Sequence, residues 1–236
     1  MNDIQLTVII PVFNEKNTIE ILLQKVLNNE IVKQIIVVDD YSKDGTREII
    51  TKKFGNKIDK IILHEKNLGK GATIKSAQKY AVGKYTIIQD ADLEYDPADY
   101  KVLLNEAEQN NLDVVYGSRV LNKNMYTNMQ NFSHRIRIWG NLFLTFLNNM
   151  INNQKLTDAH TCYKLFKTSL FKSIHLAEND FSFCPEITTK LSNLNIKINE
   201  VSISYTGRTY DDGKKIQAAD GLKAIWVLLK YKYFKK

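Results

Sequence analysis

The first half of the chain alternates short apolar runs with amphipathic segments, and this alternation limits the possible folds more than any other feature. The apolar runs have the length of buried strands, and the segments between them repeat apolar residues at helical spacing. Strands that alternate with helices build a parallel sheet covered by the connecting helices. The sequence therefore predicts an α/β fold with a Rossmann-like, mostly parallel central sheet and helices on both faces. The expected strands are Leu6–Ile10, Gln34–Val38, Lys60–His64, Tyr85–Gln89 and Asp113–Tyr116.

The expected helices have recognisable ends. Asn17 or Thr18 can cap the first helix, Gly83 is a candidate C-cap for a helix that ends near Ala81, and Asp96 can cap a helix that begins at Pro97. No linker divides the chain, so we expect one domain over residues 1–236. The later expected elements are helices over Phe132–Met150, Pro185–Leu194 and Ala218–Tyr233, and strands within Thr157–Phe166 and Ile196–Tyr205.

Carboxylates follow three of the expected strands. Glu15 lies in the loop after the first strand, Asp39 and Asp40 end the second, and Asp90 and Asp92 follow the fourth. Parallel strands end at one edge of a sheet, where open α/β folds bind ligands, so these side chains can converge. Alternating carboxylates can hold a hard divalent cation, Mg²⁺ or Mn²⁺, and the cation can hold a diphosphate. This pattern indicates a metal-dependent enzyme that uses a nucleotide sugar.

Charge and composition narrow the class of partner. The net charge of +7 suits anionic partners such as nucleotides, lipid phosphates or a membrane surface, whereas no nucleic-acid-binding motif is present. Cys162 and Cys184 make no disulfide framework, and His64, His134, His160 and His175 lack zinc spacing. No apolar stretch approaches the ~20 residues of a membrane span, and there is no signal peptide. We therefore expect a cytoplasmic protein that is peripheral at a membrane.

Four motifs, in order, resemble those of glycosyltransferase family 2. They are Pro11–Glu15, Asp39–Thr46, Asn67–Gly71 and Asp90–Glu94. The resemblance extends from about Thr7 to Tyr231 and is strongest to the dolichyl- and polyprenyl-phosphate mannose synthases and their glucose-transferring relatives. It implies the GT-A fold, inversion at the anomeric carbon, and transfer of a hexose, mannose or glucose, from a GDP- or UDP-linked donor to polyprenyl or dolichyl phosphate.

The resemblance also implies that the domain has a nucleotide-sugar-binding half (1–119) and an acceptor-binding half (120–236), and it implies roles for individual residues. Asp90 and Asp92 would carry the metal, with Glu94 as a third ligand at a position where some members have Gln. The implied nucleotide-sugar site comprises Pro11, Phe13, Asn14, Glu15, Asp39, Asp40, Lys70, Asp90, Ala91 and Asp92. The implied acceptor-phosphate site comprises Ser133, Arg135, Arg137, Arg208, Lys214 and Lys215. The implied catalytic residues are Asp92, Arg119, Asp158 and Arg208.

Alternative functions remain open at this point. A saccharide hydroxyl acceptor would need a general base, for which Asp158 or His160 lies in the matching segment, whereas a lipid phosphate needs none. A nucleotidyltransferase would need glycine in the loop after the first strand, and Val12–Glu15 has none. A non-catalytic nucleotide-sugar-binding protein is the remaining alternative. The basic, aromatic end of the last helix, Lys230–Lys236, can pack on the sheet, bind an anionic membrane surface, or do both.

Overall fold

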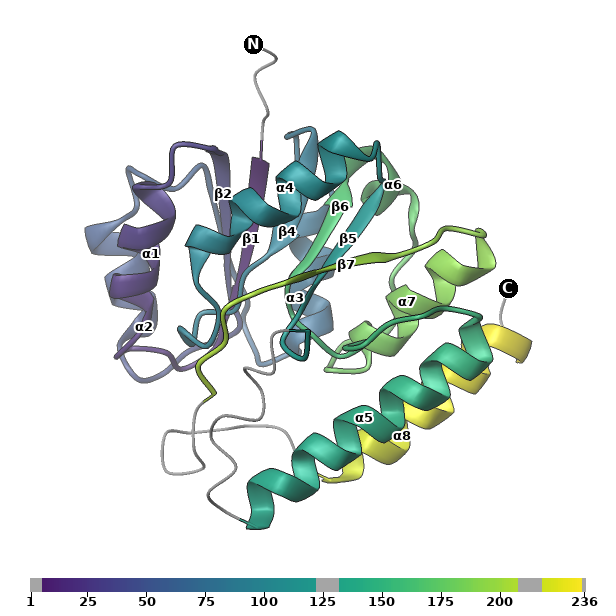
Figure 1. The fold of residues 1–236 in the computed structure, drawn as a ribbon. Coiled ribbons are helices and arrows are strands. Elements are labelled where there is room, and N and C mark those ends of the chain that lie inside the picture. Colours follow the sequence, from purple (N-terminus) through teal and green to yellow (C-terminus); the bar gives the residue numbers. More distant parts are fainter. Residues whose placement is uncertain (1–5, 122–131, 208–217, 235–236) are drawn as a thin grey trace.

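The structure is a computed structural model that describes residues 6–121, 132–207 and 218–234, with residues 132–137 and 218–220 described in their backbone only. A seven-stranded sheet runs through its centre in the order β3-β2-β1-β4-β6-β5-β7 (Figure 1). All neighbouring strands are parallel except β6, which runs antiparallel to both β4 and β5. The strands are β1 (Leu6–Val12), β2 (Val32–Asp39), β3 (Lys60–Leu63), β4 (Tyr85–Ile88), β5 (Val114–Ser118), β6 (Lys164–Lys167) and β7 (Asn199–Ser202).

Helices cover both faces of the sheet, as the sequence predicts (Figure 1). β1 shows the reason, because successive side chains of a strand point to opposite faces. Val8 and Ile10 pack with α1 and α4, whereas Ile9, between them, packs with α3 and α7. The helices are α1 (Ile19–Leu27), α2 (Thr46–Glu48) with its π-helical continuation (Ile49–Lys53), α3 (Lys70–Gln78), α4 (Tyr100–Gln109) after a 3₁₀ turn (Pro97–Asp99), α5 (Phe132–Asn152), α6 (Thr168–Ser173), α7 (Phe183–Asn193) and α8 (Ala218–Leu229) with a π-helical end (Lys230–Phe234).

Of the expected helix ends, one is confirmed and two differ. The Asp96 side chain accepts a hydrogen bond from the Ala98 amide and caps the turn that begins at Pro97. Thr18 lies at the N-cap of α1 but makes no capping bond, because its hydroxyl donates to the backbone and side chain of Glu15. α3 ends at Gln78, and the Gly83 amide donates instead to the Thr7 hydroxyl on β1.

α5 and α8 lie side by side and pack with α7, on the outer side of the molecule (Figure 1). Ile138 of α5 and Val227 and Leu228 of α8 are buried in this arrangement. Within the described residues, no helix is both long and apolar enough to cross a membrane.

Candidate active site

A cavity of about 410 Å³ lies at the carboxyl ends of β1, β2 and β4. Its volume is in the range of small-molecule sites. Residues from both halves of the chain line it, from Pro11 to Tyr205. The side chains that follow the three strands meet here, as parallel topology predicts. The predicted nucleotide-sugar residues that line the cavity are Pro11, Phe13, Glu15, Asp40, Lys70, Asp90, Ala91 and Asp92.

Asn14 and Asp39, which the sequence predicts in the same site, do not line the cavity. Asn14 joins the first two loops: its amide donates to the Ser42 hydroxyl, and its side-chain oxygen accepts from the Lys43 amide. Asp39 is fully buried and accepts from the Arg47 guanidinium Nε at 2.7 Å. The second carboxylate oxygen of Asp39 has no hydrogen-bond partner among the described residues. This oxygen is therefore a buried acceptor that the described residues leave unused.

Asp40 organises the loop that begins α3. One of its carboxylate oxygens accepts from the Leu68 amide, and the other accepts from the Gly69 amide at 2.7 Å. Gly69 has φ +93°, and a Cβ there would lie 2.6 Å from the carbonyl oxygen of Asn179. The sequence Asn67–Gly71 therefore needs glycine for two reasons, a left-handed backbone and close approach to the segment before α7. This approach brings Asp180 and Phe181 to the cavity wall.

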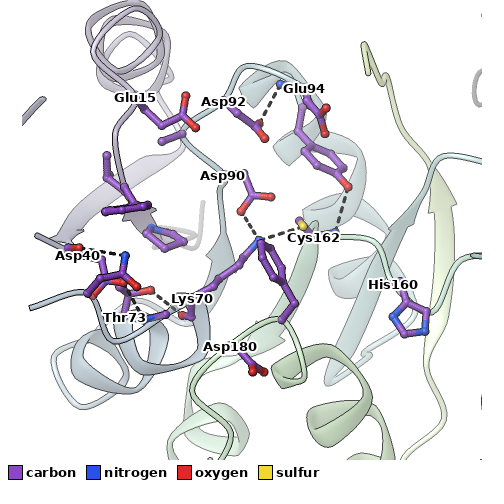
Figure 2. A pocket seen from close by; sticks show the side chains of 18 of the residues that line it. Glu15, Asp40, Lys70, Thr73, Asp90, Asp92, Glu94, His160, Cys162 and Asp180 are labelled. Carbon is purple, nitrogen blue, oxygen red and sulfur yellow. Dashed lines mark hydrogen bonds and ion pairs between the residues drawn. The ribbon is translucent and has the colours of Figure 1, made fainter. Parts of the chain in front are cut away.

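Lys70 and Asp90 form an ion pair inside the cavity (Figure 2). The ammonium also lies 3.0 Å from the Cys162 sulfur. Burial alone would lower the pKa of Lys70, but the charge of Asp90 outweighs it and holds that pKa well above its usual value. Burial likewise works to raise the pKa of Asp90, and Lys70 outweighs it, so the carboxyl stays ionised. The pair therefore keeps one positive and one negative group charged inside the cavity.

Asp92 and Glu94 line the same cavity, but the structure does not gather the three predicted metal ligands into one cluster (Figure 2). Asp92 Oδ1 accepts from the Glu94 amide at 3.1 Å, and Glu94 Oε2 accepts from the Tyr205 hydroxyl at 3.0 Å. Among the described residues, no three His, Cys, Asp or Glu side chains are close enough to form a metal site. This donor set still fits Mg²⁺ or Mn²⁺, since such ions are commonly held by one or two carboxylates together with substrate phosphates and water. Asp90 and Asp92 are two such carboxylates, so the cation does not require Glu94 as a ligand.

Arg119 is held at the cavity by Asp158. Its Nε and Nη2 donate to the two carboxylate oxygens of Asp158 at 2.6 and 2.8 Å, and Asn141 donates to the same carboxylate. Burial would raise the pKa of Asp158, but the charge and hydrogen bonds of Arg119 outweigh it and lower the pKa to about 2. Glu200 holds the backbone at Asp158 in place, because its carboxylate accepts a hydrogen bond from the Asp158 amide at 2.9 Å. Arg119 lines the cavity and Asp158 does not, so Asp158 is a positioning residue for the guanidinium.

His160, the other candidate base, lines the cavity. Burial, together with the charge of Lys164, lowers the pKa of His160 to about 4. The ring is therefore neutral at physiological pH and is a weak base. Its buried Nε2 has no hydrogen-bond partner among the described residues.

Several cavity residues were missed by the sequence reasoning. Cys162 precedes β6, and Tyr205 follows β7, in the half of the chain where the strand pattern is weakest. Tyr205 lies over the Arg119 guanidinium, with 5.1 Å between the guanidinium carbon and the ring centroid. No local motif signals these positions. The missed residues are Thr73, Tyr95, Cys162, Asp180, Phe181 and Tyr205.

The predicted acceptor-phosphate residues cannot be placed relative to the cavity. Arg208, Lys214 and Lys215 lie outside the described residues, and Ser133, Arg135 and Arg137 belong to the part of α5 whose side chains are not described. Their roles remain predictions.

The fold and the cavity define the class of protein. The chain has the fold of the GT-A glycosyltransferases, and it is similar to the glucosyl-3-phosphoglycerate synthase of Mycobacterium tuberculosis crystallised with Mn²⁺, UDP and glucosyl-3-phosphoglycerate. That match has a TM-score of 0.66 at 17% identity and covers 97% of this chain and 80% of the other. The chain belongs to glycosyl transferase family 2, whose model matches residues 7–174.

Two curated relatives indicate the branch of the family. The chain is 28% identical to the UDP-N-acetylglucosamine–dolichyl-phosphate N-acetylglucosaminyltransferase of Methanococcus voltae, over 98% of each chain. It is 27% identical to the dolichyl-phosphate beta-glucosyltransferase of Dictyostelium discoideum, over 87% of this chain and 68% of the other. These relatives confirm the resemblance to enzymes of lipid-phosphate glycosylation. They do not support the expected likeness to mannosyltransferases, since both are named for glucose-type sugars.

Proposed function

We propose that this glycosyltransferase moves glucose or N-acetylglucosamine from a UDP-linked donor to a polyprenyl or dolichyl phosphate, with inversion at the anomeric carbon. The relatives named above support the donor and acceptor classes. The carboxylates that line the cavity support a nucleoside diphosphate donor bound with a divalent cation.

The main support for a phosphate acceptor, as opposed to a hydroxyl acceptor, is the pairing of Arg119 with Asp158. Asp158 lies in the segment where a hydroxyl acceptor would need a base, but both of its oxygens already accept hydrogen bonds and its pKa is lowered to about 2. Such a carboxylate is a weak base and is poorly suited to take a proton from a sugar hydroxyl. A lipid phosphate arrives already ionised and needs no base, and Arg119 supplies a cation at the cavity.

The reaction then consists of one displacement. An oxygen of the acceptor phosphate attacks the anomeric carbon, the bond from that carbon to the β-phosphate oxygen breaks, and UDP leaves. A divalent cation bound at Asp90 and Asp92 would neutralise the charge that builds on the departing diphosphate. Lys70 places a second positive charge beside Asp90, and Arg119 is positioned to offset acceptor charge.

A saccharide hydroxyl is the second candidate acceptor, because His160 lines the cavity with an unpaired Nε2 among the described residues. The lowered pKa of His160, about 4, makes it a weak base and ranks this candidate second.

Radiolabelled transfer assays test the proposal. Purified full chain with Mn²⁺ and polyprenyl phosphate is expected to form lipid-soluble product from UDP-glucose or UDP-N-acetylglucosamine, with EDTA abolishing the signal. GDP-mannose serves as the control donor and is expected to give little product. Product with GDP-mannose alone, or product that is unaffected by EDTA, contradicts the proposed donor or the proposed cation.

A further inference from the structure

Gln89 is a fully buried polar side chain that the proposed reaction does not use. It follows β4 directly and precedes Asp90, one of the carboxylates at the cavity. Gln89 is not among the residues that line the cavity, so any effect on a bound donor must pass through other residues. A buried amide needs hydrogen-bond partners, and its partners here indicate what it does.

The Gln89 carboxamide uses all four of its hydrogen-bonding positions. Its Oε1 accepts from the Tyr100 hydroxyl at 2.6 Å and from the Tyr163 hydroxyl. Its Nε2 donates to the carbonyl oxygen of Asp90 at 2.9 Å and to that of Tyr95 at 3.5 Å. An amide oxygen can accept two hydrogen bonds and an amide nitrogen can donate two, so the group is saturated.

The two tyrosines determine which way this amide faces. Burial raises the pKa of Tyr100 and the pKa of Tyr163 well above their usual value, so both hydroxyls stay protonated. Each hydroxyl proton needs an acceptor, and the Gln89 oxygen accepts from both. The amide nitrogen therefore has to face the two backbone carbonyls.

The two carbonyls that Gln89 holds are the ends of the acidic loop, which we define as residues 90–95. The loop forms neither helix nor strand, and Leu93 has φ +61°, a left-handed backbone that leucine rarely adopts. Such a conformation persists only where surrounding contacts hold it. Asp90 and Asp92 line the cavity from this loop (Figure 2). The separation of the loop's ends therefore affects where both carboxylates lie.

Tyr163 supports the acidic loop a second time. Its ring stacks on the ring of Tyr95, with 4.8 Å between the centroids, and the Tyr95 hydroxyl accepts from the Cys162 amide at 3.2 Å. Tyr100 begins α4 and Tyr163 precedes β6. Through its two tyrosine partners, the buried amide thus ties the loop to two further elements of the fold.

These contacts give the buried amide a role in the reaction, although it does not touch a ligand. We infer that Gln89 is a positioning residue that sets the separation and orientation of Asp90 and Asp92 for a divalent cation. Side chains that hold metal ligands in place commonly affect metal affinity in this way. The inference rests on the proposed function, because it takes these two carboxylates as the ligands of the cation.

Gln89→Met tests the inference, because methionine has a similar volume but cannot donate to the two carbonyls. The variant is expected to raise the dissociation constant for Mn²⁺ by about tenfold or more. Electron paramagnetic resonance of the free ion measures this constant, with Mn²⁺ alone and with Mn²⁺ and UDP. A dissociation constant within about twofold of the wild-type value would overturn the inference.

A triple variant separates positioning from stability. Gln89→Met leaves two buried hydroxyls without their acceptor, which is expected to lower the melting temperature. Adding Tyr100→Phe and Tyr163→Phe removes these hydroxyls and is expected to recover much of that loss. The Mn²⁺ affinity of the triple variant is expected to remain low, since the loop still lacks the amide. Recovery of wild-type affinity together with the melting temperature would overturn the inference.

Thr86→Val is the matched control. Thr86 lies on β4, is fully buried and hydrogen-bonds with the Thr168 hydroxyl at 2.7 Å, but it does not line the cavity. Valine has a similar shape, so the variant is expected to lose stability and to keep the wild-type Mn²⁺ affinity. A loss of affinity as large as that of Gln89→Met would attribute the effect to general destabilisation and overturn the inference.

Hydrogen exchange tests the role of Gln89 without a cation. The backbone amides of residues 91–95 are expected to exchange faster in Gln89→Met than in the wild type, whereas Thr86→Val is expected to leave their exchange unchanged. A wild-type chain that binds no Mn²⁺ would contradict the proposed cation site. Unchanged exchange of these amides in Gln89→Met would overturn the positioning role of Gln89, so the two failures are distinguishable.

Discussion

Replacing Asp92 by alanine is expected to lower the turnover number for hexose transfer by on the order of a thousandfold. Asp92 lines the cavity, and its Oδ1 is oriented by the Glu94 amide. The loss is expected in turnover more than in donor affinity, because the cation is needed most when charge develops on the departing diphosphate. The measurement is the initial rate at saturating donor over a titration of Mn²⁺.

Asp96→Asn is the control for this experiment. Asp96 lies in the same acidic segment but outside the cavity, where it caps the turn at Pro97 and pairs with the exposed Lys25. Asparagine retains the capping function, so activity and melting temperature should remain close to those of the wild type. A rate for Asp92→Ala within about tenfold of the wild-type rate would remove Asp92 from the proposed metal site.

Asp158→Asn is expected to lower the free energy of unfolding by about 3 kcal/mol at pH 7, because it leaves the Arg119 guanidinium buried without its counter-charge. The effect should depend on pH. The pKa of Asp158 is about 2 in the folded protein, against an ordinary value of 3.8. Its ionised form therefore stabilises the fold above pH ~4, and that contribution is lost as the pH falls from ~4 towards ~2.

Urea denaturation of the wild type and of Asp158→Asn at pH 7 and near pH 3 measures this difference. The difference in the free energy of unfolding between the two proteins should be smaller at the lower pH. Asp113→Asn is the control, since Asp113 is half exposed and its pairing with Lys167 on the surface should contribute less than about 1 kcal/mol. Two results would contradict the positioning role of Asp158. One is a difference in the free energy of unfolding that is the same at both pH values, and the other is a difference no larger than that caused by Asp113→Asn.

The early part of the site was predictable from the sequence because it depends on topology. Glu15, Asp40, Asp90 and Asp92 follow parallel strands, and parallel strands deliver their following loops to the same edge of the sheet. The alternation of apolar and amphipathic segments was sufficient to predict this arrangement.

The later part of the site was not predictable in the same way. β6 inserts between β4 and β5 in the opposite direction, and nothing in its local pattern encodes that pairing. Cys162 and Tyr205 reach the cavity through such long-range contacts. Asp158 was predicted as a catalytic residue, but its pairing with Arg119 depends on a distance that the sequence does not contain. Asp39 was expected in the cavity and is instead bound by Arg47, another contact visible only in three dimensions.

The lipid-phosphate acceptor is the central claim, and a comparison of two acceptors that differ only in the phosphate tests it most directly. Labelled UDP-glucose or UDP-N-acetylglucosamine, Mn²⁺ and the full chain are incubated with polyprenyl phosphate or with the corresponding polyprenol. Because Asp158 is locked to Arg119 and His160 is a weak base, transfer is expected to polyprenyl phosphate and not to polyprenol. Equal transfer to both acceptors, or transfer to a saccharide hydroxyl with none to polyprenyl phosphate, would contradict the claim.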